Sequence, residues 1–214
     1  EAMDMGCSFL KHTSVTGIDL KNNAVSKVHT TAGSISTACV INAAGAWASE
    51  ISRMVGLDTP VIPRKGEILI SEQIEPYLKG IFLEARYIAI KHDPSIAEKS
   101  NDFAFQKGIG MVMEQTSEGN ILLGSSREFV GFDRSTNELI VEAIAKRALH
   151  FFPALKNVSM IRSFAGLRPY TPDGLPYLGP VNGVEGFIMA AVHEGDGIAL
   201  APETGRQLAE LIVN

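Results

Sequence analysis

The run Val40-Ile41-Asn42-Ala43-Ala44-Gly45-Ala46-Trp47 carries most of the information about how this chain folds. Its first half is apolar enough to form a strand inside a sheet, and its second half is a turn made of residues without bulk. Small residues at such a turn let the backbone approach a neighbour closely. The neighbour is either another strand or a flat ligand, and both interpretations stay open on these residues alone.

Alternating sequence before this run predicts a β-meander that ends in the buried strand 38–42. Its earlier strands are expected at 14–20, 24–30 and 34–37. After the run we expect a helix over 47–55, because Gly56 is a typical stop. Further strands are predicted at 61–71, 80–83, 87–91, 110–115 and 120–124, and the polar stretch 93–107 is expected to be a loop.

The remaining sequence predicts two more helices and three short strands. The clearest helix covers 136–151, where Ser135 and Glu138 have the spacing of a capping box. Strands are expected at 158–167, 177–178 and 186–191, followed by a last helix over 198–212. Strands therefore dominate and the three helices are far apart, which indicates an α+β fold. The sequence contains no G-x-G-x-x-G, so it carries no dinucleotide-binding fingerprint.

Length and composition exclude several classes of protein. The 214 residues are 45% hydrophobic and 20% charged, which is typical of one or two globular domains. The net charge of −5 removes the electrostatic case for nonspecific binding to nucleic acid. The most apolar run, 38–48, is far shorter than the roughly 20 residues of a spanning helix, so no membrane span is predicted. The two cysteines suit neither a disulfide scaffold nor a metal site, which favours a cytoplasmic protein.

Two segments carry residues that packing alone does not require. Arg168 follows an apolar strand and precedes a proline, and a half-buried guanidinium suits a carboxylate or phosphate. The alternative is an arginine paired with an internal acid or with carbonyl groups. The second segment, His193-Glu194-Gly195-Asp196-Gly197-Ile198, opens the last helix, where backbone N–H groups favour negative charge. His193 by itself has no serine or cysteine nearby that would form a triad.

Taken together, these segments resemble the FAD-dependent D-amino-acid oxidase family, in the branch of glycine oxidase, the sarcosine oxidase β subunit, and opine, proline or cyanide-forming dehydrogenases. The resemblance runs in order along nearly the whole chain. It rests on three runs and their spacing: Ile41 to Ala48; Gly166-Leu167-Arg168-Pro169 with Thr171 to Pro176; and His193-x-Gly195-x-Gly197-Ile198 with Leu200-Ala201-Pro202. The strand and turn Asn120 to Ser126 also match that branch.

The resemblance implies a C-terminal fragment that lacks the N-terminal dinucleotide-binding βαβ unit. Residues 1–56 would be the second segment of an FAD-binding domain with a mixed sheet, and residues 163–214 its closing segment. Residues 57–162 would be a substrate-binding domain with an antiparallel sheet. FAD would be noncovalent, because no cysteine lies near Pro172. The fragment alone is expected to lack flavin and to be inactive.

The resemblance also implies roles for individual residues. Arg168 would bind the substrate carboxylate, in a reaction that oxidises the C–N bond of an amino acid or N-alkyl amino acid by hydride transfer to flavin. By the same resemblance, the residues expected to contact FAD are these: Val15, Gly45, Ala46, Trp47, Gly166, His193, Glu194, Gly195, Asp196, Gly197, Ile198 and Ala199.

Three other functions stay open. The first is a related flavoenzyme that oxidises a hydroxy acid or glycerol phosphate, with Arg168 binding a different anion. The second is a fragment or assembly subunit that is not itself an enzyme and works with the missing N-terminal segment or with other subunits. The third, an unrelated binding module, requires every motif to coincide by chance. In the first case the expected partner is still a small anionic substrate.

Overall fold

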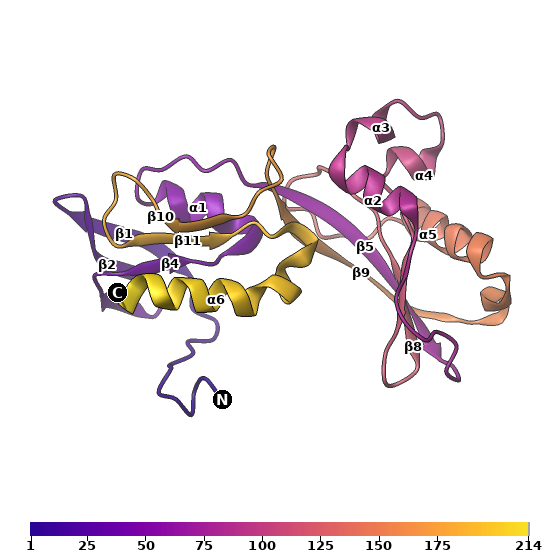
Figure 1. The fold of residues 1–214 in the computed structure, drawn as a ribbon, viewed down its shortest axis with the longest axis horizontal. Coiled ribbons are helices and arrows are strands. Elements are labelled where there is room, and N and C mark those ends of the chain that lie inside the picture. The colour runs from indigo at the N-terminus through magenta and orange to yellow at the C-terminus, as the bar shows by residue number, and fades with distance from the viewer. Residues whose placement is uncertain (214) are drawn as a thin grey trace. The chain divides into compact units, whose positions relative to one another are not determined.

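The computed structural model describes residues 1–213, except for the side chain of residue 98. The chain divides into two compact units. Unit 1 contains residues 1–61 and 171–214, and unit 2 contains residues 62–170. Both units combine helices with sheets, so the chain is a mixed α and β protein with antiparallel and mixed sheets (Figure 1).

The first sheet of unit 1 contains the first three strands of the predicted meander. Its predicted last strand, β4 (Val40–Asn42), belongs to the second sheet instead, because it pairs with a strand near the end of the chain. Strands β1 (Val15–Lys21), β2 (Ala24–Thr30) and β3 (Gly33–Ser36) pair antiparallel in the order β1-β2-β3. Asn22 and Asn23 both have positive φ, at 53° and 62°. Asparagine tolerates this conformation, which a two-residue hairpin turn requires. The turn chemistry therefore explains why the two long strands meet in this register.

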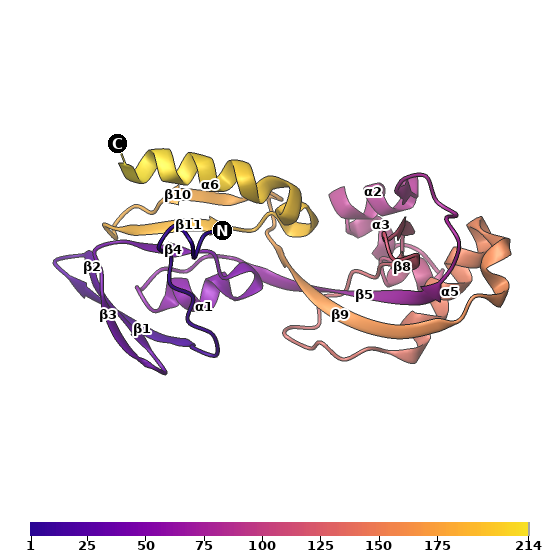
Figure 2. The same cartoon turned by 90° about the horizontal axis from the view of Figure 1, so that it is seen from below.

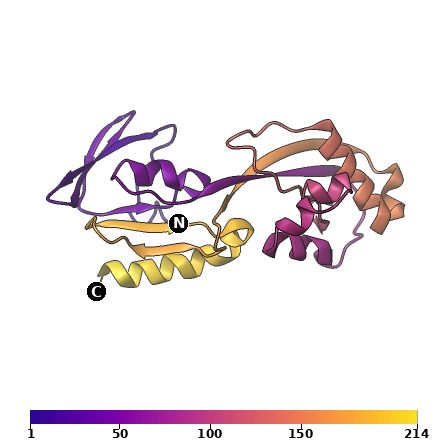
Figure 3. The same cartoon turned by 90° about the horizontal axis from the view of Figure 1, so that it is seen from above.

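The second sheet of unit 1 is mixed. Strand β11 (Phe187–Ala191) lies in the centre, antiparallel to β10 (Tyr177–Pro180) and parallel to β4 (Val40–Asn42). Helix α6 (Gly197–Val213) runs along one face and α1 (Ala48–Arg53) lies on the other (Figures 2 and 3). Because helices cover both faces, β11 is apolar along its length and almost entirely buried.

Unit 2 is built on one antiparallel sheet in the order β6-β7-β8-β5-β9. Its strands are β5 (Ile62–Gln73), β6 (Phe82–Leu83), β7 (Val112–Gln115), β8 (Asn120–Gly124) and β9 (Met160–Tyr170). Helix α5 (Glu138–Phe151) packs on one face. Its apolar stripe of Ile140, Ile144 and Ala148 joins a core that includes Leu69 and Leu123.

Two buried charges fix the start of α5 against β5. The carboxylate of Glu67, which is fully buried, accepts from the backbone N–H of Asn137 at 3.0 Å. Lys65 Nζ lies 3.3 Å from that carboxylate and 3.2 Å from Asp133 Oδ2. Burial lowers the pKa of Lys65, but hydrogen bonds to Asp133 and Glu67 outweigh it and raise the pKa. The alternation of a strand puts Lys65, Glu67 and Leu69 on the α5 face.

Three local predictions were wrong. The predicted strand 87–91 lies in helix α2 (Ala85–His92), because a short apolar run does not distinguish a strand from a helix. The predicted loop 93–107 contains two short helices, α3 (Ser95–Glu98) and α4 (Phe103–Gln106). Helix α5 is capped by Asn137, whose Oδ1 accepts from Leu139 N at 2.9 Å, and begins two residues after the predicted start.

Within residues 1–213, none of the helices is both long enough and apolar enough to cross a lipid bilayer.

Candidate functional site

In unit 1, two predicted loops leave the same edge of the mixed sheet. Strands β4 and β11 are parallel neighbours, with Ile41 opposite Ile188 and Asn42 opposite Met189. Their carboxyl ends therefore lie side by side, and the turn 43–47 and the loop 192–197 both start there. In sheets with parallel strands, ligands bind outside this carboxyl edge.

The turn after β4 is held by a buried asparagine. Asn42 Nδ2 donates to the carbonyl of Ala48 at 2.9 Å, and its Oδ1 accepts from Ala44 N at 3.2 Å. Between these anchors the chain forms a 3₁₀ turn over Gly45–Trp47. Gly45 has φ +55°, and a side chain placed there would meet open space. The backbone is therefore accessible at this turn, as the small residues of the sequence predicted.

The loop after β11 has an unusual backbone. Val192 and Glu194 have φ values of +73° and +50°, a conformation that is strained for a β-branched residue. A 3₁₀ turn over Glu194–Asp196 follows, and α6 begins at Gly197. His193 lies at the start of that turn, and its Nε2 is 2.9 Å from Thr204 Oγ1. Backbone strain of this kind is concentrated at ligand-binding loops.

Three predicted flavin contacts of unit 1, Val15, Ile198 and Ala199, lie outside the turn 43–47 and the loop 192–197. Ile198 and Ala199 lie in the first turn of α6, and the Ile198 side chain is 96% exposed. The first N–H groups of a helix have no partner within the helix. Val15 begins β1, which belongs to the three-stranded sheet and not to the sheet of β4 and β11. The mixed sheet therefore groups the residues of the turn and the loop, whereas Val15 comes from the other sheet.

An apolar pocket of about 590 Å³ lies between α6 and the edge strand of the mixed sheet. Strand β4 forms the end of that sheet, and its Ile41 side chain is 45% exposed. The pocket is lined by apolar and small residues from both sides, with His193 and Thr204 as its polar members: Ile41, Ala43, Ala190, Ala201, Gly205 and Leu208 are among the others.

In unit 2, Arg168 lies within β9, on the face of the sheet opposite α5. The pairing of β5 with β9 puts Gly66 opposite Gly166 and Arg64 opposite Arg168. The Arg168 guanidinium reaches diagonally across to β5 and lies flat on Gly66. A Cβ at Gly66 would come within 2.0 Å of Arg168 Nη1 and 2.6 Å of its Cζ. Only glycine leaves room for this side-chain position.

The acceptors of Arg168 are neutral. Nη2 donates to Ser125 Oγ at 2.7 Å, and Nη1 donates to the carbonyl of Ser126 at 3.3 Å. No acid of the described chain lies within ion-pair distance of this guanidinium. We call Arg168, Gly66, Ser125 and Ser126 the Arg168 cluster. An arginine has five N–H donors, so three remain for a ligand, and no carboxylate among the described residues neutralises the positive charge.

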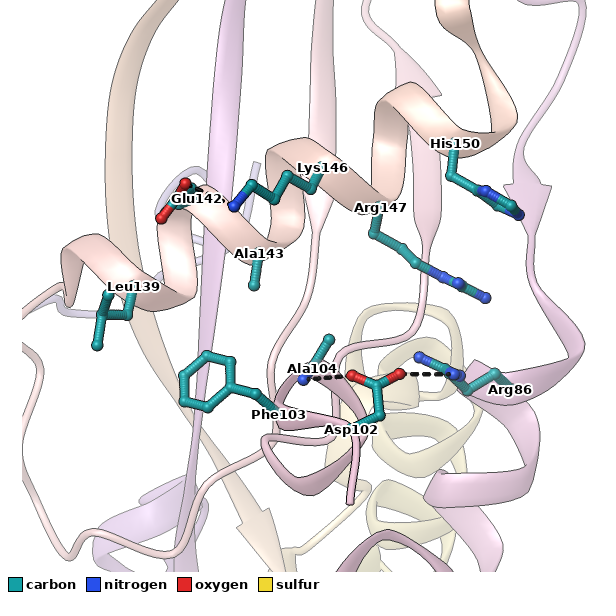
Figure 4. Close-up of a pocket in the computed structure, with 10 residues that line it drawn as sticks. All are labelled: Arg86, Asp102, Phe103, Ala104, Leu139, Glu142, Ala143, Lys146, Arg147 and His150. Carbon is teal, nitrogen blue, oxygen red and sulfur yellow. Dashed lines mark hydrogen bonds and ion pairs between the residues drawn. The ribbon is translucent and has the colours of Figure 1, made fainter. Parts of the chain in front are cut away.

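A pocket elsewhere in unit 2 contains cations that, unlike Arg168, have acidic partners (Figure 4). It measures about 420 Å³ and lies between α4 and α5, with Phe103 and Leu139 among its apolar residues. Its cations face acids: Arg86 lies 3.3 Å from Asp102 and Lys146 lies 2.7 Å from Glu142. Arg147 likewise pairs with the carboxylate of Glu84. An anion would have to displace these carboxylates, so the Arg168 cluster is the better candidate for binding one.

The sequence did not identify every member of these sites. Ser125, Ser126 and Gly66 were not predicted as site residues, although the Gly-Ser-Ser run after β8 was part of the resemblance. Thr204, the partner of His193, was also missed. Among the described residues there is no group of three or more His, Cys, Asp or Glu side chains that could hold a metal ion.

Comparisons with known proteins identify the family of the chain. The family model described as FAD dependent oxidoreductase, DAO, matches residues 1–211. Hydrogen cyanide synthase subunit HcnC from Pseudomonas protegens is 36% identical over 213 residues, which are 99% of this chain and 45% of that protein. Glycine oxidase from Geobacillus kaustophilus has a crystal structure with a TM-score of 0.81 and 29% identity, covering 99% of this chain and 50% of that one.

A second similar structure is L-proline dehydrogenase from P. horikoshii, with a TM-score of 0.84 and 27% identity. It covers 99% of this chain and 52% of the enzyme's. This chain thus spans about half the length of the relatives that it matches. The match with the family model extends over almost all of the 214 residues, and the chain therefore belongs to the DAO family of FAD-dependent oxidoreductases.

Proposed function

We propose that this chain is part of an FAD-dependent enzyme that oxidises the C–N bond of an amino acid or N-alkyl amino acid. The observation that carries this proposal is Arg168, a half-buried cation that is oriented by neutral groups and has no acid partner among the described residues. Such a guanidinium is suited to a carboxylate from outside the chain. The relatives named glycine oxidase and L-proline dehydrogenase support this class of substrate.

In this proposal Arg168 binds and orients the substrate. Two hydrogen bonds to the protein fix the guanidinium and three N–H donors remain, so a carboxylate can be held by two of them at once. Removing the arginine leaves that carboxylate without its partner, which costs about 2–5 kcal/mol when the site is dry. The misplaced substrate loses rate as well.

The residues of unit 1 suit one part of FAD. The accessible turn Gly45–Trp47 and the strained loop 192–197 leave the same sheet edge, and the turn offers backbone without bulk. We propose that Gly45, Ala46, Trp47 and residues 193–199 contact the flavin, that its binding is noncovalent, and that Val15 and Gly166 lie against the cofactor as well. When bound, FAD supplies the acceptor for the electron pair of the oxidised C–N bond. The N–H groups at the start of α6 would stabilise negative charge there.

The phosphate part of FAD needs residues that these 214 do not contain, since the sequence has no G-x-G-x-x-G. We propose that a further N-terminal segment supplies it and that residues 1–56 and 163–214 complete an FAD-binding domain with it. Residues 57–162 would form the substrate domain. The outer edge of β4, with Ile41 exposed above the apolar pocket, is where an added strand would pair.

A substrate panel on the FAD-loaded full-length protein tests the proposal. Glycine, sarcosine, proline and an opine are mixed anaerobically with the enzyme, and loss of the oxidised-flavin absorbance is followed. Reduction by one of these amines, lost in Arg168→Met, is the expected result. Reduction by hydroxy acids or glycerol phosphate and by none of the amines contradicts it and favours the related flavoenzyme.

A second candidate is that this chain serves as a subunit or assembly partner and is not itself catalytic. The missing phosphate-binding turn favours it, and the relative HcnC is named as a subunit of hydrogen cyanide synthase. Purification of the native complex separates the two candidates, because flavin and amine oxidation would then be found only in fractions that contain another polypeptide.

A further inference from the structure

We propose that Ser125 is a positioning residue for Arg168. Its hydroxyl and the bare Cα of Gly66 together fix the plane of the guanidinium, so that the remaining N–H donors are presented to a ligand carboxylate. This inference rests on the proposed function of Arg168, and it adds residues that neither the sequence nor the comparisons identify.

The contact between Ser125 and Arg168 has the geometry of a strong hydrogen bond. The distance from Nη2 to Oγ is 2.7 Å, and the Ser125 side chain is almost fully buried, at 3% exposure. The backbone of Ser125 is itself fixed, since its N–H donates to the carbonyl of Gly110 at 3.1 Å. The acceptor for Arg168 is therefore rigid.

A neutral acceptor has a specific advantage at this position. An aspartate or glutamate would also orient the guanidinium, but its charge would compete with the carboxylate of a ligand, as in the pocket of Figure 4. A hydroxyl and a carbonyl oxygen hold two donors and leave the net charge of +1 in place. Orientation is thus obtained without loss of the attraction for an anion.

Gly66 and Gly166, which lie opposite each other on β5 and β9, have different roles. Gly66 lies beneath the guanidinium, where a methyl group would collide with three of its atoms, at 2.0 to 2.6 Å. Gly166 lies opposite on β9, and a Cβ there would meet nothing within 4 Å. Gly66 therefore supports the arginine, and Gly166 leaves free space on the same face beside it.

The alternative is that Ser125 is only a buried polar group that happens to find a partner in Arg168. Measuring the motion of the Arg168 side chain distinguishes the two roles. If Ser125 is only structural, replacing it leaves the guanidinium as rigid as in the wild type. The FAD-loaded full-length protein is labelled with ¹⁵N-arginine and kept anaerobic, the Arg168 Nε–H signal is assigned with Arg168→Lys, and its hydrogen exchange and ¹⁵N relaxation are measured. Sarcosine is then titrated, with its amide as the ligand that lacks the carboxylate.

Ser125→Ala should speed Nε–H exchange and weaken sarcosine binding, each by about fivefold, which corresponds to one lost hydrogen bond. Ser125→Thr keeps the hydroxyl and should restore both values. The control is Ser163→Ala, since Ser163 lies on β9 but on the α5 face. Gly66→Ala is a second test of the guanidinium position, because its methyl group displaces the guanidinium and leaves Ser125 unchanged.

The outcomes test the positioning role of Ser125 separately from the proposed carboxylate ligand of Arg168. Unchanged exchange in Ser125→Ala overturns the positioning role, and so does faster exchange with unchanged sarcosine affinity. Faster exchange in a chain whose wild type does not bind sarcosine supports positioning and contradicts the proposed ligand of Arg168. Circular dichroism of each variant confirms that the sheet is intact, and if Ser125→Ala unfolds, the Ser125→Thr and Gly66→Ala pair decides.

Discussion

Replacing Glu84 by glutamine should destabilise unit 2 far more than the loss of an exposed carboxylate of the same unit. Glu84 is 8% exposed and joins three parts of the unit. Its carboxylate accepts from Met111 N at 2.9 Å and pairs with Arg147, and Arg86 Nε lies 3.7 Å away. Glutamine keeps the shape but removes the charge and turns one acceptor into a donor that faces Arg147.

The magnitude follows from what the change leaves behind. Removing one partner of a fully buried ion pair costs about 3–5 kcal/mol. The Arg147 side chain is 22% exposed, so water recovers part of that loss, and we expect about 2–3 kcal/mol near neutral pH. Glu142→Gln is the matched control. It breaks the exposed Glu142–Lys146 pair of the same pocket and should cost less than about 0.5 kcal/mol.

The effect should also depend on pH in a defined direction. Burial raises the pKa of Glu84, but hydrogen bonds from Arg147 and Met111 N, with the charges of Arg147 and Arg86, outweigh burial and hold the pKa below its ordinary value of 4.5. A lowered pKa stabilises the fold above 4.5, and this stability is lost as the pH falls below that value. The gap between wild type and Glu84→Gln should therefore shrink in acid.

Hydrogen exchange resolved to peptides of unit 2 is the suitable assay, since it reports on that unit by itself in a chain of two compact units. The single tryptophan, Trp47, lies in unit 1 and reports on that unit. A Glu84→Gln protein as stable as the control variant would refute the reasoning. So would a gap of the same size at about pH 7 and about pH 3.5.

Three further results are expected. Gly186→Ala should destabilise unit 1 by about 2–4 kcal/mol, because φ is +76° and the new Cβ would lie 2.0 Å from the carbonyl of Ala38. Gly183→Ala, with φ +89° and open space around it, should cost only the backbone strain. Urea titrations of both variants measure the two losses of stability, and equal losses would disprove the clash. Asn42→Ala should lower the stability of unit 1 by about 2 kcal/mol through its lost hydrogen bonds to Ala48 and Ala44, and an unchanged unfolding midpoint by Trp47 fluorescence would contradict this. The purified 214-residue chain should show no visible absorbance from bound flavin, and a yellow protein at unit stoichiometry would contradict the need for a further FAD-binding segment.

The parts of the fold that depend on local sequence were predictable. The first three strands of the meander and the presence of a strand before Ala43 follow from alternation and from two-residue turns, and both are confirmed. The prediction that the strand before Ala43 ends the meander inside its sheet was wrong, because β4 pairs with β11 at the edge of the mixed sheet and its Ile41 is 45% exposed. Helix α2 was missed because Tyr87 to Lys91 is a short apolar run that fits both periods. The start of α5 was missed because the buried carboxylate of Glu67, 70 residues earlier, fixes the N–H of Asn137.

The candidate site shows the same division. Arg168 and the loop at His193 were found because residue type and neighbours along the chain point to anion binding. The contact of Arg168 with Ser125 spans 43 residues and depends on the register of β5 with β8 and β9, which no local pattern contains. Gly66 likewise acquires its role only through that register. Local sequence patterns therefore could not predict the roles of Ser125 and Gly66, which depend on strand pairing.

The most direct test of the role of Arg168 is a crystal structure of the FAD-loaded full-length protein with a small carboxylate bound. Two oxygens of that carboxylate should lie about 2.7–2.9 Å from two nitrogens of the Arg168 guanidinium, while Nη2 still contacts Ser125 Oγ. A carboxylate bound elsewhere, or an Arg168 side chain paired with an acid of the protein itself, would contradict the account.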